Sequence, residues 1–158
     1  MNESIVNNWN SKIQANNQVY LLGDVSFGDK DKTKSILKRL NGKIYLVKGN
    51  HDKLSKMEYM DRFEWIKDYH ELFVQDPSVN GGRQMIILCH YAFLVWNRIH
   101  HGSWSLFGHS HNNLKFDDGN RRMDVGVDTN NYFPYSYQNI KNIMTNKTFN
   151  SYDHHDGL

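Results

Sequence analysis

Seven polar residues of this chain are of types that bind metal ions or transfer protons. They occur at the ends of four apolar runs and are Asp24, Asn50, His51, Asp52, His90, His109 and His111. Imidazole nitrogens combined with carboxylate and amide oxygens suit a first-row divalent cation such as Mn, Fe, Zn or Ni. An aspartate can bridge two cations through its two oxygens, whereas an asparagine supplies a neutral carbonyl ligand. The pattern indicates a metal site assembled from distant parts of the chain.

Simpler structural roles remain open for several of these residues. Asn, Gly, His and Asp are common in turns, so the stretch 49–52 could be only a turn. Asp24 could cap the loop that follows it, and His90 could be a histidine at the rim of the core. The pair His109 and His111 is harder to explain in this way. In extended backbone both side chains would point the same way, and in a glycine-initiated loop they could address two neighbouring ions.

Two short strands are expected to position the first of these residues. Val19–Leu22 and Ile44–Val47 are compact apolar runs, and a helical pattern lies between them. Such a crossover predicts parallel strands and a right-handed connection. The carboxyl ends of the two strands then share one rim of the sheet, where ligands bind in open α/β sheets. This arrangement brings Asp24 near Asn50.

The other elements follow from apolar periodicity and turn residues. The chain opens with an amphipathic helix whose apolar stripe is Met1, Ile5, Trp9 and Ile13. Strands from residue 85 onward are expected to form a second sheet. The remaining expected elements are a helix capped by Asp29 or Asp31 and ended by Asn41-Gly42, a polar helix over 53–62, one or two strands over 63–74, a hairpin turn over 76–82, strands over 85–89, 104–107 and 123–127, a loop or short helix over 91–102, and a final helix over 136–145.

Length and composition limit the class of protein. The 158 residues predict one domain over 1–145, followed by a polar tail over 146–158. Formal net charge is +2 with basic residues spread along the chain, which argues against a nucleic-acid-binding stripe. No apolar run approaches the ~20 residues of a membrane span. The polar, Asn-rich start lacks the apolar segment of a signal peptide. The sole cysteine, Cys89, is expected in the core and fits a reducing compartment, so we expect a soluble cytoplasmic protein.

The ordered motifs resemble a known family. Gly23-Asp24, Gly49-Asn50-His51-Asp52, His90 and Gly108-His109-Ser110-His111 occur in this order, each at the end of an apolar strand. In this they resemble the calcineurin-like metallophosphoesterases, most closely the small bacterial and phage members. The resemblance covers residues 1 to about 145. It implies an α/β fold, namely a four-layer α-β-β-α sandwich with two mixed sheets.

The resemblance also implies a role for each residue. Asp24 would bridge two divalent cations, and Asn50, His90 and His109 would complete the shell of one of them. His111 would bind the other cation. His51 would act as general acid on the leaving-group oxygen, oriented by Asp52. The implied activity is hydrolysis of a phosphoester, in the first place a phosphodiester, by a hydroxide activated between the two cations.

One family motif has no counterpart before Asp24. The family begins with Asp-x-His at the end of an N-terminal strand, which supplies two ligands to the cation that His111 binds. We therefore expect the first strand to be missing, one cation to be bound instead of two, and activity to be impaired. Asp153-His154-His155 contains the same spacing, so Asp153 and His155 are candidate replacements, as is the amine of Met1.

Several alternatives stay open. A non-catalytic metal-binding remnant or scaffold module on the same fold would bind one ion or none, whereas two ions per chain favour the enzyme. The substrate could be a nucleic acid, a nucleotide, a phospholipid or a phosphoprotein, and the oligomeric state is not specified. His100-His101 and His154-His155 are expected in solvent, and His70 is expected to be packed or on the surface. Trp96 and Arg98 could contact substrate or serve packing.

Overall fold

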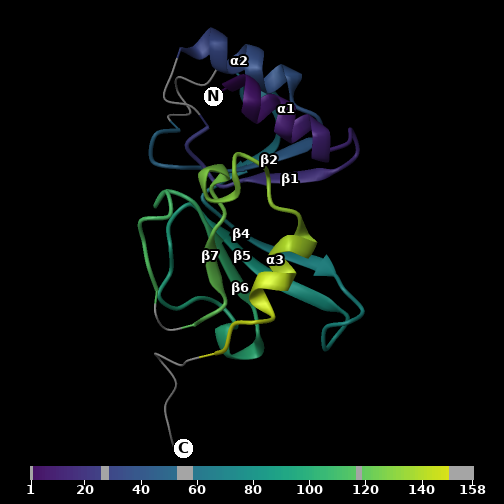
Figure 1. The fold of residues 1–158 in the computed structure, drawn as a ribbon, viewed down its shortest axis with the longest axis vertical. Helices are drawn as coiled ribbons and strands as arrows, with labels where there is room; N and C mark the ends of the chain where they lie inside the picture. Colours follow the sequence, from purple (N-terminus) through teal and green to yellow (C-terminus); the bar gives the residue numbers. More distant parts are fainter. Residues whose placement is uncertain (1, 26–28, 53–58, 117–118, 150–158) are drawn as a thin grey trace, which may run out of the picture.

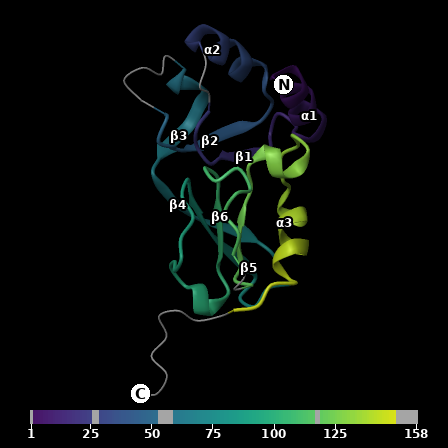
Figure 2. The ribbon, with the colours of Figure 1, turned by 60° about the vertical axis from the view of Figure 1, so that its left-hand side comes forward.

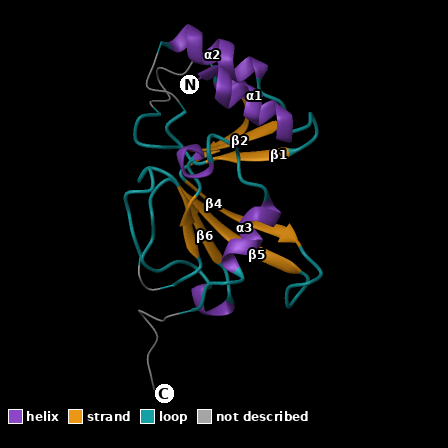
Figure 3. Cartoon of the chain, in the orientation of Figure 1, coloured by secondary structure: helices purple, strands orange, loops and turns teal. Residues whose placement is uncertain are grey.

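The computed structural model describes residues 2–25, 29–52, 59–116 and 119–149 (Figure 1). These residues form a mixed α/β fold with two sheets and three α-helices (Figure 3). In chain order the elements are α1 (Asn2–Lys12), β1 (Gln18–Leu21), α2 (Lys30–Arg39), β2 (Lys43–Val47), the 3-10 turn η2 (Met60–Arg62), β3 (Phe63–Lys67), β4 (Tyr69–Gln75), β5 (Arg83–Cys89), η3 (Ile99–His101), β6 (Trp104–Phe107), β7 (Arg122–Asp124), η4 (Val127–Asn130) and α3 (Tyr137–Met144).

The first sheet has the strand order β1-β2-β3, and all its strands are parallel. Helices α1 and α2 cover one of its faces, at the top of Figures 1 and 2. Their apolar side chains pack on Ile44 and Leu46, which are fully buried. Trp9 joins this core, and its indole N–H donates to the carbonyl of Asn41 at 2.8 Å. The predicted opening helix and parallel strand pair are confirmed.

The second sheet has the order β4-β5-β6-β7, with β4 antiparallel to β5 and the other pairs parallel. Alternate residues of β5 face opposite ways, as the pleat requires. Ile86 and Leu88 belong to a core shared with Val47 of the first sheet, whereas Met85 and Ile87 pack with the segment after β5. The two sheets therefore lie face to face around a common apolar layer.

The fourth, helical layer of the expected sandwich is not confirmed. The buried residues of α3, Ile140 and Met144, join the core between the two sheets. The other face of the second sheet is covered by Trp96 and Ile99, which precede β6. The first sheet, as described, is also parallel throughout, so the expectation of two mixed sheets holds only for the second.

Several boundaries differ from the sequence-based expectation. Residues 63–74 form two strands of different sheets, so the second sheet begins at β4 and not at residue 85. A seven-residue antiparallel register between β4 and β5 fixes this assignment. Strand β7 ends at Asp124, earlier than expected, because the 3-10 turn η4 begins at Val127. Of the predicted polar helix, residues 53–58 lie outside the described residues, and Met60–Arg62 form a 3-10 turn.

Local caps explain where α2 begins and ends. Asp29, not Asp31, is its N-cap, since its carboxylate accepts from the backbone N–H of Lys32 at 3.0 Å. The helix ends at Arg39 with Leu40 as its C-cap, and Gly42 then adopts φ +95. A Cβ at Gly42 would lie 2.9 Å from Ile13, so this turn requires glycine. In the described part of the chain, no helix is long and apolar enough to cross a bilayer.

Candidate metal centre

The turn after β1 brings two distant loops into direct contact. Gly23 and Asp24 both have positive φ, at +86 and 52. A Cβ at Gly23 would lie 2.4 Å from His90 Nδ1 and 2.5 Å from the backbone nitrogen of Gly49. A Cβ at Gly49 would lie 2.3 Å from Asp24 Oδ1. Both glycines are therefore required by close approach, and they let the ends of β1, β2 and β5 meet.

Asp52 holds the loop after β1 and the loop after β2 together. Its carboxylate, in a residue only 6% exposed, accepts from the backbone N–H groups of Gly49 at 2.9 Å, Asp24 at 2.8 Å and Val25 at 3.0 Å. In return, Asp24 Oδ1 accepts from the backbone N–H of His51 at 2.9 Å. The described contacts of the Asp52 carboxylate thus connect the two loops. That Asp52 also orients the ring of His51 stays a prediction.

His90 is oriented so that one ring nitrogen faces the cluster. Its Nδ1 lies 2.7 Å from the carbonyl of Leu22, which can only accept, so Nδ1 carries the proton. In the neutral ring Nε2 then presents a lone pair. That nitrogen lies 2.9 Å from Asn50 Oδ1, 3.1 Å from His109 Nδ1 and 3.4 Å from Asp24 Oδ2. Four of the predicted metal-site residues therefore converge.

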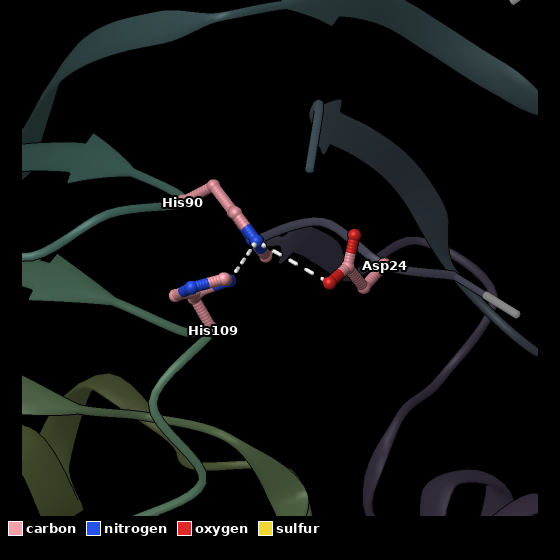
Figure 4. A group of neighbouring side chains, drawn as sticks. All are labelled: Asp24, His90 and His109. Atoms are coloured by element: carbon pink, nitrogen blue, oxygen red, sulfur yellow. Dashed lines mark hydrogen bonds and ion pairs between the residues drawn. The ribbon is translucent and has the colours of Figure 1, made fainter. Parts of the chain in front are cut away.

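Three of these residues form a group that could hold a cation (Figure 4). Ligand atoms of Asp24, His90 and His109 all lie within 4.8 Å of one another. Figure 4 shows the three side chains pointing toward one another from the segments that follow β1, β5 and β6. Among the described residues, no other group of three His, Cys, Asp or Glu side chains brings its ligand atoms this close together.

The separations fit a first-row cation. Ligand bonds of about 2.1 Å place neighbouring ligand atoms about 3.0 Å apart in an octahedron and about 3.4 Å apart in a tetrahedron. The three separations from His90 Nε2 are 2.9, 3.1 and 3.4 Å. With a neutral His90, its Nε2 lone pair faces a carboxylate oxygen and an amide oxygen at these distances, and a cation among them would stabilise all three groups. The residues present therefore fit a bound divalent cation.

The cluster is buried on one side and open on the other. The side chain of His90 is 2% exposed and that of Asp24 is 10% exposed. Asn50 and His109 are exposed, as is His51. Tyr91 is 48% exposed, and its ring lies 5.0 Å from that of His90 and 4.8 Å from that of His109. A ligand can thus reach the cluster from solvent past an aromatic side chain.

His111 lies outside this group and has a carboxylate partner of its own. Its Nδ1 lies 2.8 Å from Asp128 Oδ2. A histidine whose Nδ1–H is held by a carboxylate presents Nε2 to a cation, an arrangement common among metal-ligating histidines. His111 is 61% exposed at its side chain, so Nε2 remains accessible. Metal binding by His111 stays a prediction.

The loop that carries both histidines is strained and is held by the end of β7. His109, His111 and Asn112 have φ of 62, 45 and 60, a region that non-glycine residues rarely adopt. Asp124 Oδ2 accepts from the backbone N–H of Asn112 at 3.0 Å, and its Oδ1 accepts from Gly126 at 2.8 Å. Such strain persists only where neighbouring contacts fix it, and Asp124 supplies them.

Sequence reasoning missed Asp124 and Asp128, although a signal was present. Asp128 directly follows the predicted strand 123–127 and so obeys the same rule as the other candidates, a polar residue at the end of an apolar run. The path of the chain through η4, which returns Asp128 to His111, could not be read from the sequence. The carbonyl of Leu22, which fixes the His90 tautomer, carries no sequence signal because any residue has a carbonyl.

The other candidate residues lie elsewhere. His70 packs on β4 between aromatic rings, 4.7 Å from Trp65, and burial lowers the pKa of its imidazole. His100 and His101 are exposed at η3. Trp96 is buried, and its indole N–H donates to Ser103 Oγ at 3.0 Å, so the packing interpretation is confirmed. Cys89 is buried, as expected. Asp153, His154 and His155 lie outside the described residues.

Comparison with known proteins shows a shared fold. No protein-family model matches the chain. The chain is 28% identical over 151 residues to the uncharacterized protein MJ1445 of Methanocaldococcus jannaschii, a match that covers 91% of this chain and 75% of that protein. It superposes on the crystal structure of AQ665, a protein of unknown function from Aquifex aeolicus, with a TM-score of 0.62 and 21% identity, over 90% of this chain and 84% of the other. The two share one fold.

A more distant similarity is to a crystal structure of a Vps29 single mutant from Entamoeba histolytica. It has a TM-score of 0.47 and 16% identity, and it covers 78% of this chain and 63% of that one.

Proposed function

We propose that this chain is a metal-dependent phosphoester hydrolase of the calcineurin-like metallophosphoesterase type, acting in the first place on phosphodiesters. The observation that carries the proposal is the convergence of Asp24 Oδ2, Asn50 Oδ1 and His109 Nδ1 on His90 Nε2, at 2.9 to 3.4 Å. These four atoms come from the ends of four different strands. Their order along the chain is that of the family motifs that the sequence resembles.

Hydrogen bonds fix the orientation of two of the residues that would hold the cation. His90 is fixed through Leu22, and Asp24 is fixed by the backbone N–H of His51. A divalent cation bound there would polarise a phosphoryl oxygen and promote ionisation of a water molecule. The exposed Asn50 and His109 face the open side, where the phosphoester would approach.

We assign to His51 the role of general acid. Its backbone N–H donates to Asp24 Oδ1 at 2.9 Å, and the residue is exposed, which supports this role. A protonated imidazole within hydrogen-bond reach of the leaving-group oxygen would protonate the departing alkoxide, a contribution of about 10²- to 10⁴-fold in rate. Asp52 maintains this position by fixing the turn that carries His51.

Asp24 and His111 would together hold a second cation. The contact of His111 with Asp128 would orient the ring for that role. We expect this second site to bind its cation more weakly than the first cluster does. Asp24 and His111 supply fewer ligands than the four residues of the first cluster.

The experiment is a comparison of metal content and diesterase activity in three variants. Wild-type protein loaded with Mn²⁺ is expected to hydrolyse bis-p-nitrophenyl phosphate. His90→Ala should lose both the bound metal and the activity. His51→Ala should retain the metal and lose turnover. His100→Ala, an exposed histidine at the other end of the second sheet, serves as the matched control and should behave as wild type.

The outcomes separate the proposal from its alternative. A metal-loaded wild type with no activity on any phosphoester would indicate a binding module and would overturn the proposal. Undiminished activity in His90→Ala would show that the cluster is not the active site. Loss of metal in His51→Ala would make His51 a ligand and not an acid.

A further inference from the structure

A pocket of about 580 Å³ lies at the opposite end of the second sheet from the metal centre. Strands β5, β6 and β7 are parallel, and the pocket is lined by residues at or just before their first positions, including Arg83, Ser103 and Arg121. His90 and His109 follow the last positions of β5 and β6. A seven-residue strand separates the two ends by roughly 20 Å. The pocket is therefore distinct from the cation cluster.

The lining is strongly cationic. Arg83, Arg98, Arg121 and Lys141 line it, and the single carboxylate among its lining residues is that of Asp76. An excess of positive charge is thus concentrated here in a chain whose formal net charge is only +2. Confining several like charges costs free energy unless an anion offsets it.

The carboxylate of Asp76 already has partners within the protein. Asp76 Oδ2 lies 2.6 Å from Lys141 Nζ and 2.6 Å from the Tyr137 hydroxyl, and its Oδ1 accepts from Ser78 Oγ at 2.7 Å. Lys141 and these two hydroxyl groups hold the pKa of Asp76 well below its usual range. Asp76 therefore neutralises Lys141. In the described part of the chain, no carboxylate forms an ion pair with any of the three arginines.

The arginines project from fixed backbone. The carbonyl of Arg98 accepts from the N–H groups of His101 and Ser103, and the carbonyl of Arg121 accepts from Ser105 at 2.9 Å. The guanidinium of Arg83 lies over the Phe73 ring, 4.7 Å from its centroid. Gln84, which also lines the pocket and is buried, donates through Nε2 to the carbonyls of Met85 at 2.7 Å and Gly102 at 3.0 Å. The backbone of Arg98 and Arg121 and the guanidinium of Arg83 are thus held by defined contacts.

We propose that this pocket binds a small compound bearing two or more phosphoryl groups. Guanidinium groups bind phosphate oxygens through paired hydrogen bonds, which favours arginine for such ligands. Three arginines, one at the start of β5 and two from separate loops, exceed what one phosphoryl group requires. The pocket volume of about 580 Å³ lies within the range of about 300 to 1,000 Å³ found for small-molecule sites.

The test measures binding of tripolyphosphate by calorimetry at near-physiological ionic strength. The protein is first stripped of metal, and the chelator is removed by dialysis, because a chelator is itself a polyanion. We expect saturable binding of one tripolyphosphate per chain. The double variant Arg98→Ala/Arg121→Ala should weaken it at least tenfold. Lys32→Ala/Lys38→Ala, which removes two exposed charges from α2, should leave it unchanged.

Three results would overturn the proposal. The first is equal weakening by the arginine and lysine variants, which would indicate only non-specific charge attraction. The second is equally tight binding of citrate, which would show that the pocket does not distinguish phosphoryl groups. The third is loss of binding in metal-free His90→Ala with retention in the arginine variant, which would place the ligand at the metal centre. The thermal unfolding midpoint of each variant shows whether it is folded. Arg98→Lys/Arg121→Lys, which keeps the charge, should bind tripolyphosphate more tightly than the alanine double variant but less tightly than wild type.

Discussion

The carboxylate of Asp52 accepts a hydrogen bond from the backbone N–H of Asp24 at 2.8 Å. This contact joins the loop after β1 to the loop after β2, and the same oxygen also accepts from Gly49. The position of Asp24 in the cation cluster therefore depends on Asp52, a residue outside the group that could hold a cation.

Asp52→Asn is expected to weaken both stability and metal binding. The amide replaces one of two oxygens that together accept from three backbone N–H groups, so at least one of these partly or fully buried donors loses its partner. Loss of a hydrogen bond to a charged group costs about 1.5–3 kcal/mol, and supporting residues of metal sites typically contribute about 10- to 100-fold in affinity. Chemical unfolding and metal titration of the same variant measure the two effects. Wild-type metal affinity in Asp52→Asn would show that Asp24 is positioned by other contacts.

Gly23→Ala should disrupt the metal centre, and Gly81 provides a matched control. Both glycines have similar φ, +86 and +83, but a Cβ at Gly23 would lie 2.4 Å from His90 Nδ1, whereas nothing lies within 4 Å of one at Gly81. Both substitutions incur the left-handed backbone cost of about 1–2 kcal/mol. Only Gly23→Ala should add an overpacking cost of about 1–3 kcal/mol.

The comparison is made on metal content and on the free energy of unfolding. Gly81→Ala should retain the wild-type amount of metal, and Gly23→Ala should not. Equal effects of the two substitutions would mean that backbone strain, and not the contact with His90, explains the glycine.

Asp128→Asn is expected to lower phosphodiester turnover about 10-fold or more without unfolding the protein. Its carboxylate lies 2.8 Å from His111 Nδ1, and both side chains are partly exposed, so little stability depends on the pair. If Asp128 acts through His111, the substitution should have no further effect on turnover in a His111→Ala background. Additive losses in the double variant would show that Asp128 acts independently.

Acid should weaken the contact between α3 and the hairpin turn after β4. Lys141 and Tyr137 on α3 hold the pKa of Asp76 well below its ordinary value. A carboxyl with a depressed folded-state pKa stabilises the fold above its unfolded pKa of about 4, and this stabilisation is lost as pH falls through the lower folded value. Asp76→Asn should therefore be less stable than wild type at pH 7, with a difference that shrinks steadily below pH 4. Asp61→Asn, at an exposed residue, is the control and should leave the stability close to that of wild type.

The contradicting result for Asp76 would be a stability difference that stays constant between pH 7 and pH 2. That outcome would attribute the effect of the substitution to geometry alone.

The sequence by itself determined the parts that depend on local pattern. Apolar runs located most strands, and the apolar stripe at residues 1–13 located α1. The polar residues that follow four of these runs were predicted as the members of the cluster. This was possible because side-chain chemistry and position after a strand are both local properties. The parallel pairing of β1 and β2 followed from the connecting helix.

Only the tertiary structure decided how these pieces meet. Strands β3 and β4 are neighbours in the chain but belong to different sheets, since pairing depends on contacts with β2 and β5 that no local pattern encodes. The His90 tautomer depends on the carbonyl of Leu22, 68 residues away. The partner of His111 and the cationic pocket at the far end of the second sheet likewise arise from long-range packing. Sequence composition specifies which groups are available, and the packing of distant segments specifies which of them face one another.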